Sequence, residues 1–307
     1  MTAPVLLYGP LVVTVTMWAF QAPALHALGE RWDPATLNIV RYLVAMVAFA
    51  LIAGLVPGGR DAPRERLAPA QGVLVGGLFA GFGLLFATGS VLGNPVVTAT
   101  ATALAPLTAS LVTWVVMGQR PARPLVLALV LVVPGAILAM PAPEGTGGDR
   151  PVVGLALVIL AQICWSLYSL AVPRLMPATS TMRRSWLSIQ WALPFHLVLF
   201  LLSWSLGLGR ADPSYPVFDA GVTLAAALGP LVLGLVLWNL SVSRLGLPVC
   251  ALFLNFVPVT GTLIAWAFGT VPTSQQFAGV ALVMLGMGMA QYRRRDTTEG
   301  RSPLPRS

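Results

Sequence analysis

The sequence predicts an all-α membrane protein whose ten transmembrane helices form two inverted five-helix repeats. Composition, the spacing of apolar runs and an internal repeat lead to this fold class. Of the 307 residues, 57% are hydrophobic and only 9% are charged, whereas about 25% of the residues in a typical soluble domain are charged. So few charges cannot cover the surface of a soluble protein of this size. The apolar runs are also longer than the roughly 10-residue alternating strands of a membrane β-barrel.

Ten apolar runs are separated by glycine, proline and charged residues, and a helix needs roughly 20 residues to cross a membrane. The predicted spans are residues 5–27, 35–56, 70–92, 95–117, 124–141, 152–173, 185–206, 220–242, 248–268 and 275–292. The first run has no basic segment before it and leads directly into further spans, so we interpret it as a span and not as a secretory signal. Cys164 and Cys250 both fall inside apolar runs, which favours inert thiols over a disulfide or a metal pair.

Arginine is distributed unevenly between alternate loops. If the N-terminus is cytoplasmic, the cytoplasmic loops and the tail hold 14 arginines, and the opposite side holds three, Arg31, Arg150 and Arg210. Because basic residues accumulate in cytoplasmic loops, this bias predicts that both termini are cytoplasmic. The basic tail, residues 293–307, is expected to rest on anionic headgroups. The net charge of +8 therefore indicates membrane orientation, and we expect no nucleic-acid partner.

The two halves of the chain resemble each other, which predicts a first repeat at 1–146 and a second at 147–292. The longest matching stretch aligns APLTASLVTW at 105–114 with VPVTGTLIAW at 257–266. The recurring pairs include Trp18 and Trp165, Pro95 and Pro248, Pro106 and Pro258, and Trp114 and Trp266. Each half has five spans, and an odd number inserts the second half upside down. Inverted repeats are typical of transporters with a substrate site between the halves.

Several motifs resemble the drug/metabolite transporter superfamily in its EamA-like ten-helix branch. They are the stretch LVTWVVMGQRP, the Arg41-Tyr42 pair, a tryptophan in the first and sixth spans, and the segment SRLGLPVCALFLNFVPVTG. The resemblance covers roughly residues 5–292 and implies a carrier of the bacterial inner membrane, most often an exporter of amino acids and other metabolites. The family often has Gly-Glu-Arg where this chain has Gly118-Gln119-Arg120, so no role of that glutamate is transferred.

The predicted spans contain no Asp or Glu, and Arg41 is their one charged residue. Without a buried carboxylate, a proton-coupled exporter of lipophilic cations is not expected. A charge this deep costs about 2.5–3.5 kcal/mol on insertion scales and needs a partner or water. Arg41 either anchors a substrate carboxylate or has a structural role, by snorkelling or by bonding helix-end carbonyls or Asp33. Asn38 lies one turn earlier on the same face and shares either role.

The first and sixth spans each carry a tryptophan and a glutamine on one face. These residues are Trp18 and Gln21 in the first span and Gln162 and Trp165 in the sixth. Lipid would leave the amides unsatisfied, so the faces point inward, to line a watered site or to bond neighbouring helices. Further candidates for substrate contact are Tyr168, Trp238, Asn239 and Asn255. Asn255 lies three positions before Pro258.

The main hypothesis for function is a secondary active or facilitative exporter of small organic metabolites, amino-acid-like, that works by alternating access. The alternatives are a multidrug exporter of lipophilic compounds and a non-catalytic channel or auxiliary subunit. We expect no catalytic residue, metal or cofactor, because His26 and His196 are well separated and no in-span carboxylate accompanies them. His196 is either a proton carrier or a structural group. Partners are expected to be a small-molecule substrate and the bilayer, with the chain a monomer or weak homodimer.

Overall fold

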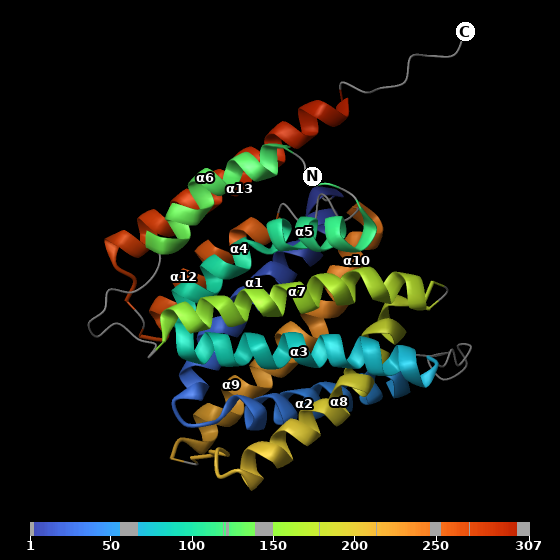
Figure 1. Ribbon diagram of the computed structural model, residues 1–307. Coiled ribbons are helices and arrows are strands. Elements are labelled where there is room, and N and C mark those ends of the chain that lie inside the picture. The colour runs from blue at the N-terminus through green and yellow to red at the C-terminus, as the bar shows by residue number, and fades with distance from the viewer. Residues whose placement is uncertain are drawn as a thin grey trace.

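The computed structural model describes residues 3–55, 67–118, 120, 123–138, 150–177, 179–212, 214–245, 253–269 and 271–299. These residues are almost entirely helical, and strand-like pairing within them is limited to one isolated bridge between Trp32 and Ala211. The elements (Figure 1) are α1 (Ala3–Gly29), α2 (Pro34–Leu55), α3 (Pro69–Gly93), α4 (Pro95–Ala103), α5 (Ala105–Met117), α6 (Arg123–Leu138), α7 (Pro151–Leu175), α8 (Thr181–Ser205), α9 (Pro216–Ala227), the π-helix η1 (Leu228–Gly234), α10 (Leu235–Leu245), the 3₁₀-helix η2 (Leu254–Phe256), α12 (Val257–Ala267) and α13 (Ser274–Glu299). The predicted all-helical character is confirmed.

Proline marks the start of many of these helices. Its fixed φ suits the first helical turn, and its missing N–H is not needed there. The helices with proline at the first or second position include α3, α4, α5, α7 and α9. At the other end of α5, Gly118 has a φ of 72° and caps the helix through its N–H to the Trp114 carbonyl. Glycine adopts this left-handed conformation without a Cβ clash.

Helical segments lie within all ten ranges predicted as spans. By length and composition, six of the described helices can cross a membrane, and a seventh span results if the bent pair α4 and α5 counts as one. Ser274–Gly286 is a shorter apolar stretch. A multi-pass membrane protein is therefore supported, whereas the count of ten spans stays a prediction.

The packing partners of the two halves correspond to each other. In the first half α3 packs against α7 and α8, and in the second the α9–α10 segment packs against α1 and α2. Likewise α12 contacts α1, while α4 and α5 contact α7. The pair α6 and α13 lies beside α4 and η2 at one side of the bundle (Figure 1). Exchange of the halves leaves this pattern unchanged, which is what two equivalent repeats would give; their inverted orientation in a membrane stays a prediction.

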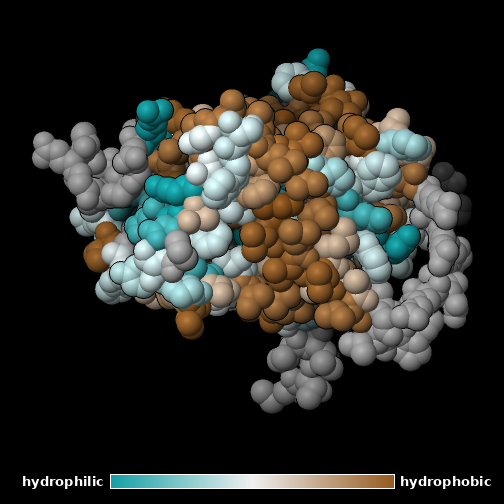
Figure 2. All heavy atoms as spheres, turned by 90° about the horizontal axis from the view of Figure 1, so that it is seen from below, coloured by the Kyte–Doolittle hydropathy of each residue, from teal (hydrophilic) through white to brown (hydrophobic). Residues whose placement is uncertain are grey.

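The surface of the bundle matches a bilayer environment. Figure 2 shows a broad apolar band across one face, with more polar surface towards both ends. Large apolar side chains are exposed along the helices, such as Val115 at 83% and Val130 at 71%. So large an exposed apolar area is unfavourable in water, whereas contact with lipid chains stabilises it. The band therefore supports a position within the membrane.

Three proline positions break the regularity of the helices. The α4 and α5 axes differ by 43° at a break before Pro106, and the 3₁₀ turn η2 precedes Pro258. Both breaks agree with the expected effect of proline. Because proline has no backbone N–H, the carbonyl one turn earlier loses its helical hydrogen bond. The third break, the π-helix around Pro230, was not predicted.

Candidate functional site

Three tryptophans from α1, α7 and α10 meet in the centre of the bundle. The Trp18 ring lies 5.8 Å from Trp165 in an edge-to-face arrangement and 4.9 Å from Trp238. The cluster continues into α3, since Phe82 lies 5.1 Å from Trp165, and along α7, where Tyr168 stacks on Trp165 at 5.2 Å. The repeat relates Trp18 to Trp165, and the fold brings these two residues into contact. Such a cluster offers apolar ring faces together with indole N–H donors.

The glutamines on the same two helices are largely buried, and the described residues offer their side-chain amides no hydrogen-bond partner. Gln21 is 6% exposed and Gln162 is 4% exposed. Among the described residues, no hydrogen bond is formed by either side-chain amide. The nearby hydroxyls behave differently: Thr14 and Ser166 donate to carbonyls of their own helices, those of Pro10 and Gln162. The two amides therefore keep their hydrogen-bonding capacity for water or a ligand.

Arg41 on α2 is a buried cation, 1% exposed. Its Nη1 donates to the Asn38 side-chain oxygen at 3.2 Å, and its Nε and Nη2 donate to the Ala226 carbonyl at 3.4 and 3.3 Å. Asn38 in turn donates to the Gly83 carbonyl at 3.1 Å, so this network joins α2, α3 and α9. All three Arg41 bonds exceed the roughly 2.7–2.9 Å of a charge-assisted bond. Within the described residues, no carboxylate pairs with Arg41.

The Ala226 carbonyl is available to Arg41 because of a proline. In an α-helix this carbonyl would accept from the N–H four residues later, but that residue is Pro230, which has none. The chain continues as the π-helix η1, a distortion often found at functional sites. On the same helix, the Pro230 carbonyl accepts from the Trp18 indole at 3.3 Å. The π-helix therefore binds Trp18, and the last turn of α9 directly before it binds Arg41.

Close approach of Trp18 to the π-helix requires a glycine. A Cβ added at Gly234 would lie 2.9 Å from the Trp18 Nε1 atom, closer than real Cβ contacts. Glycine at this position lets the indole reach the Pro230 carbonyl. No sequence pattern predicted this contact. The sequence signals at this place are Gly229-Pro230 and Gly234, which lie inside an apolar run.

His196 on α8 is fully buried against Tyr42, with 4.1 Å between the ring centroids. Both of its ring nitrogens lack a hydrogen-bond partner among the described residues. A buried polar group without a partner is uncommon in proteins. His196 is therefore a second polar group near the Arg41 segment that has unused hydrogen-bonding capacity.

The residues predicted from the sequence fall into two joined groups. Trp18, Trp165, Tyr168 and Trp238 form the aromatic cluster, and Asn38 and Arg41 form the polar network. The α9–η1 segment contacts both groups, through Pro230 to Trp18 and through Ala226 to Arg41. The side chains of Asn239 and Asn255 lie outside the described residues. Of the two structural partners considered for Arg41, a helix-end carbonyl is found, that of Ala226 near the end of α9, and Asp33 is not a partner. Asp33 accepts instead from the Arg210 N–H and from the residues that begin α2.

The chain is similar to several known proteins. Residues 6–140 match the EamA-like transporter family. The chain is 27% identical over 301 residues, 95% of this chain and 97% of the relative, to a probable terminal-alkyne amino-acid exporter of Streptantibioticus cattleyicolor. It is 24% identical over 266 residues, 83% of this chain and 84% of the relative, to the uncharacterized transporter YyaM of Bacillus subtilis. A solved structure with 18% identity agrees in fold, with a TM-score of 0.64, and covers 94% of this chain and 97% of its own.

Proposed function

We propose that this chain, which belongs to the drug/metabolite transporter superfamily, exports small amino-acid-like metabolites by alternating access between its two five-helix halves. The family match and the names of the relatives indicate a multi-pass membrane transporter rather than an enzyme, and they support a small-molecule exporter. One relative bears the name of an amino-acid exporter, which favours that substrate class here. The chain would lie in a bacterial inner membrane with both termini cytoplasmic, as a monomer or weak homodimer.

The observation that carries this proposal is the buried Arg41, to which no carboxylate of the described residues is paired. Its three hydrogen bonds, to Asn38 and to the Ala226 carbonyl, are 3.2–3.4 Å long. A carboxylate offers two oxygens in the geometry that matches a guanidinium fork, with shorter and stronger bonds. A substrate carboxylate would therefore replace weak interactions with a bidentate ion pair.

The surroundings of Arg41 suit the rest of an amino acid. The ring faces of Trp18, Trp165 and Trp238 would contact the apolar side chain. The side-chain amide oxygens of Gln21 and Gln162 would accept from the ammonium group. Tyr168, Asn239 and Asn255 would extend the wall of this site, as the sequence suggests.

Alternating access is supported by the equivalent packing of the halves and by the position of the proposed site between them. The tryptophans that meet come from α1 of the first half and from α7 and α10 of the second. Movement of one half against the other would therefore change the contacts around the substrate directly. Transport would be secondary active or facilitative.

The test is transport by protein reconstituted in liposomes. A thermal-shift screen first identifies ligands among amino acids, nucleosides and lipophilic drugs, and it includes a terminal-alkyne amino acid and its saturated counterpart. Arg41→Gln should lower transport of the carboxylate ligand more than 10-fold, and Arg41→Lys should fail to restore it because a lysine lacks the planar fork. Arg183→Gln, which removes an arginine stacked on Trp186 away from the site, should transport normally. Normal transport by Arg41→Gln would contradict the proposal.

A second candidate, a multidrug exporter of lipophilic compounds, is favoured by the aromatic cluster itself. Three tryptophans in contact suit flat apolar molecules as well as amino-acid side chains. The buried positive charge of Arg41 opposes lipophilic cations. Neutral or cationic drugs that stabilise the protein equally with and without Arg41, while amino acids do not, would favour this second function.

A further inference from the structure

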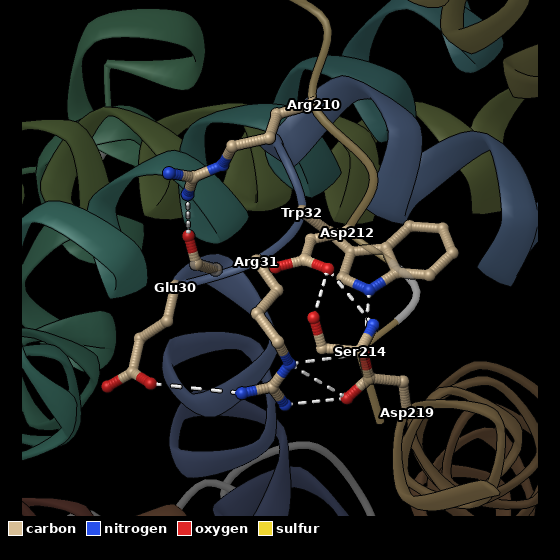
Figure 3. A network of polar contacts seen from close by, with 8 residues as sticks. Glu30, Arg31, Trp32, Arg210, Asp212, Ser214 and Asp219 are labelled. Carbon is tan, nitrogen blue, oxygen red and sulfur yellow. Dashed lines mark hydrogen bonds and ion pairs between the residues drawn. The ribbon is translucent and has the colours of Figure 1, made fainter. Parts of the chain in front are cut away.

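A dense polar network joins two turns at one end of the molecule. The first is the turn between α1 and α2, and the second is the connection between α8 and α9 (Figure 3). Arg31 from the first turn pairs with Asp219 of α9 at 2.6 Å through Nη2 and bonds the same carboxylate through Nε at 3.1–3.2 Å. The indole of Trp32 donates to Asp219 at 2.9 Å. One carboxylate thus holds two consecutive residues of the opposite turn.

The backbones of the two turns are also paired. Trp32 and Ala211 form an isolated antiparallel bridge. On either side of it, the Asp33 N–H donates to the Arg210 carbonyl at 2.9 Å and the Asp212 N–H donates to the Arg31 carbonyl at 3.1 Å. The Arg210 side chain adds a bond of 2.6 Å to the Gly29 carbonyl, where α1 ends.

The Asp33 carboxylate provides a second point of attachment. It accepts from the Arg210 N–H at 3.0 Å and from the Ser203 hydroxyl of α8 at 3.2 Å. Next to it, the Trp204 indole donates to the Thr36 hydroxyl at 2.9 Å. The first turn belongs to residues 1–146 and the second to residues 147–292, so every one of these bonds crosses between the proposed halves.

The Arg31–Asp219 pair is partly shielded from water. The side chain of Arg31 is 16% exposed and that of Asp219 is 2% exposed. Arg31 also lies over the rings of Tyr215 and Phe218, at 5.2 and 5.8 Å. Partial burial strengthens such a pair relative to a surface ion pair. Among the described residues, both ion pairs lie at this end.

We propose that this network is the latch of the outer gate, closed in the present structure, and that it opens once in each transport cycle. The proposal rests on alternating access as the proposed function, because that mechanism separates the halves at each end in turn. The arginine bias places this end outside. With the latch closed, the central tryptophans are sealed from the outside; with Arg31 and Asp219 separated, a released substrate leaves there.

A disulfide across the bridge tests the opening directly. The flanking backbone bonds make Trp32 and Ala211 a non-hydrogen-bonded pair, with a Cα separation of about 4.5 Å, within the roughly 4.4–6.8 Å that a disulfide spans. In a Cys164→Ser/Cys250→Ser background, Trp32→Cys/Ala211→Cys should cross-link on mild oxidation. Cross-linking should lower the transport rate at least 10-fold, and reduction should restore it. The oxidant should leave the transport rate of each single cysteine variant unchanged. A fully cross-linked protein that transports as fast as its reduced form would overturn the latch.

A second measurement does not need a substrate, so failure of the latch is distinguishable from failure of the proposed function. In the same background, Gln21→Cys reports access to the site by a membrane-impermeant thiol reagent added outside. Arg31→Gln or Asp219→Asn should raise the labelling rate several-fold, and the exchange Arg31→Asp/Asp219→Arg should lower it again. The matched control is Asp212→Asn, since this exposed carboxylate accepts only from Ser214 among the described residues, and it should label as the parent does. Equal labelling of the parent and the single charge variants contradicts the latch even if no substrate is found.

Discussion

Replacement of Gly234 by alanine is a sharp test of the π-helix as the support for Trp18. The new Cβ would lie 2.9 Å from the Trp18 Nε1 and 3.2 Å from its Cδ1, and also 3.2 Å from the Gly229 carbonyl oxygen. The indole must move by several tenths of an ångström, and its 3.3 Å bond to the Pro230 carbonyl would then be lost. The contacts of Trp18 with Trp165 and Trp238 would change as well.

The magnitude follows from three opposing effects. Loss of one hydrogen bond costs about 0.5–1.5 kcal/mol, and an overpacked methyl group costs about 1–3 kcal/mol. The replacement of a helical glycine by alanine returns about 0.5–1 kcal/mol. The net expectation is a loss of about 0.5–4 kcal/mol, with a midpoint of about 2 kcal/mol. If the loss appears in binding, the midpoint corresponds to a roughly 30- to 50-fold weaker substrate affinity; otherwise the unfolding temperature falls.

The assay compares Gly234→Ala with Gly221→Ala in the same predicted span. At Gly221 no atom lies within 4 Å of an added Cβ, so that variant should be neutral or slightly more stable. Thermal unfolding in detergent and ligand affinity are measured for both variants. Gly234→Ala/Trp18→Phe, which removes the clashing N–H, should recover part of the loss of stability. If Gly234→Ala behaves as Gly221→Ala does, the contact between Trp18 and the π-helix is not what positions the indole.

The other predictions concern the site, pH and topology. Trp165→Ala should abolish transport while the protein still folds and inserts, and substrate should slow thiol labelling of Gln21→Cys and Gln162→Cys; labelling that no substrate alters would place the site elsewhere. Burial raises the pKa of Asp33, but hydrogen bonds from Thr36, Arg210 and Ala35 outweigh it and lower the pKa below its usual 3.8. A lowered pKa means that the contribution of Asp33 to stability is present above the unfolded value and is lost as pH falls through the folded value. The unfolding temperature of the protein in detergent should therefore show no loss due to Asp33 between pH 8 and about 5; a drop near pH 6 that is absent in Asp33→Asn would refute this. Reporter fusions at residues 30, 93, 147, 213 and 271 should all report the outside, and cytoplasmic signals at two or more would contradict the topology.

The helical fold could be predicted from the sequence because each helix leaves local signals. Apolar runs, and prolines such as Pro151 and Pro216 that begin helices, set the helix positions closely. The inward position of Trp18 and Trp165 also follows from the sequence, since a glutamine shares each face and lipid cannot satisfy an amide. These inferences need only one helix and its solvent.

The partners of the charged groups could not be predicted, because they depend on which helices meet. Arg41 and Ala226 are 185 residues apart. Every residue has a backbone carbonyl, so the sequence singles out that of Ala226 only through Pro230, which lacks the N–H that would bond it. Arg31 and Asp219 are 188 residues apart. Hydropathy placed both near span ends, where charges are expected, and it gave no reason to pair them. The π-helix is similarly hidden, since proline in a membrane helix more often indicates a simple kink.

The central claim is that Arg41 binds the carboxylate of the substrate. The most direct test is the affinity of the purified protein for an amino-acid ligand and for its neutral carboxamide analogue, measured by titration on the parent and on Arg41→Gln. The account predicts that the parent prefers the carboxylate by at least 10-fold and that Arg41→Gln binds the two compounds about equally, with its carboxamide affinity close to that of the parent. A preference for the carboxylate that survives in a folded Arg41→Gln protein would contradict the claim.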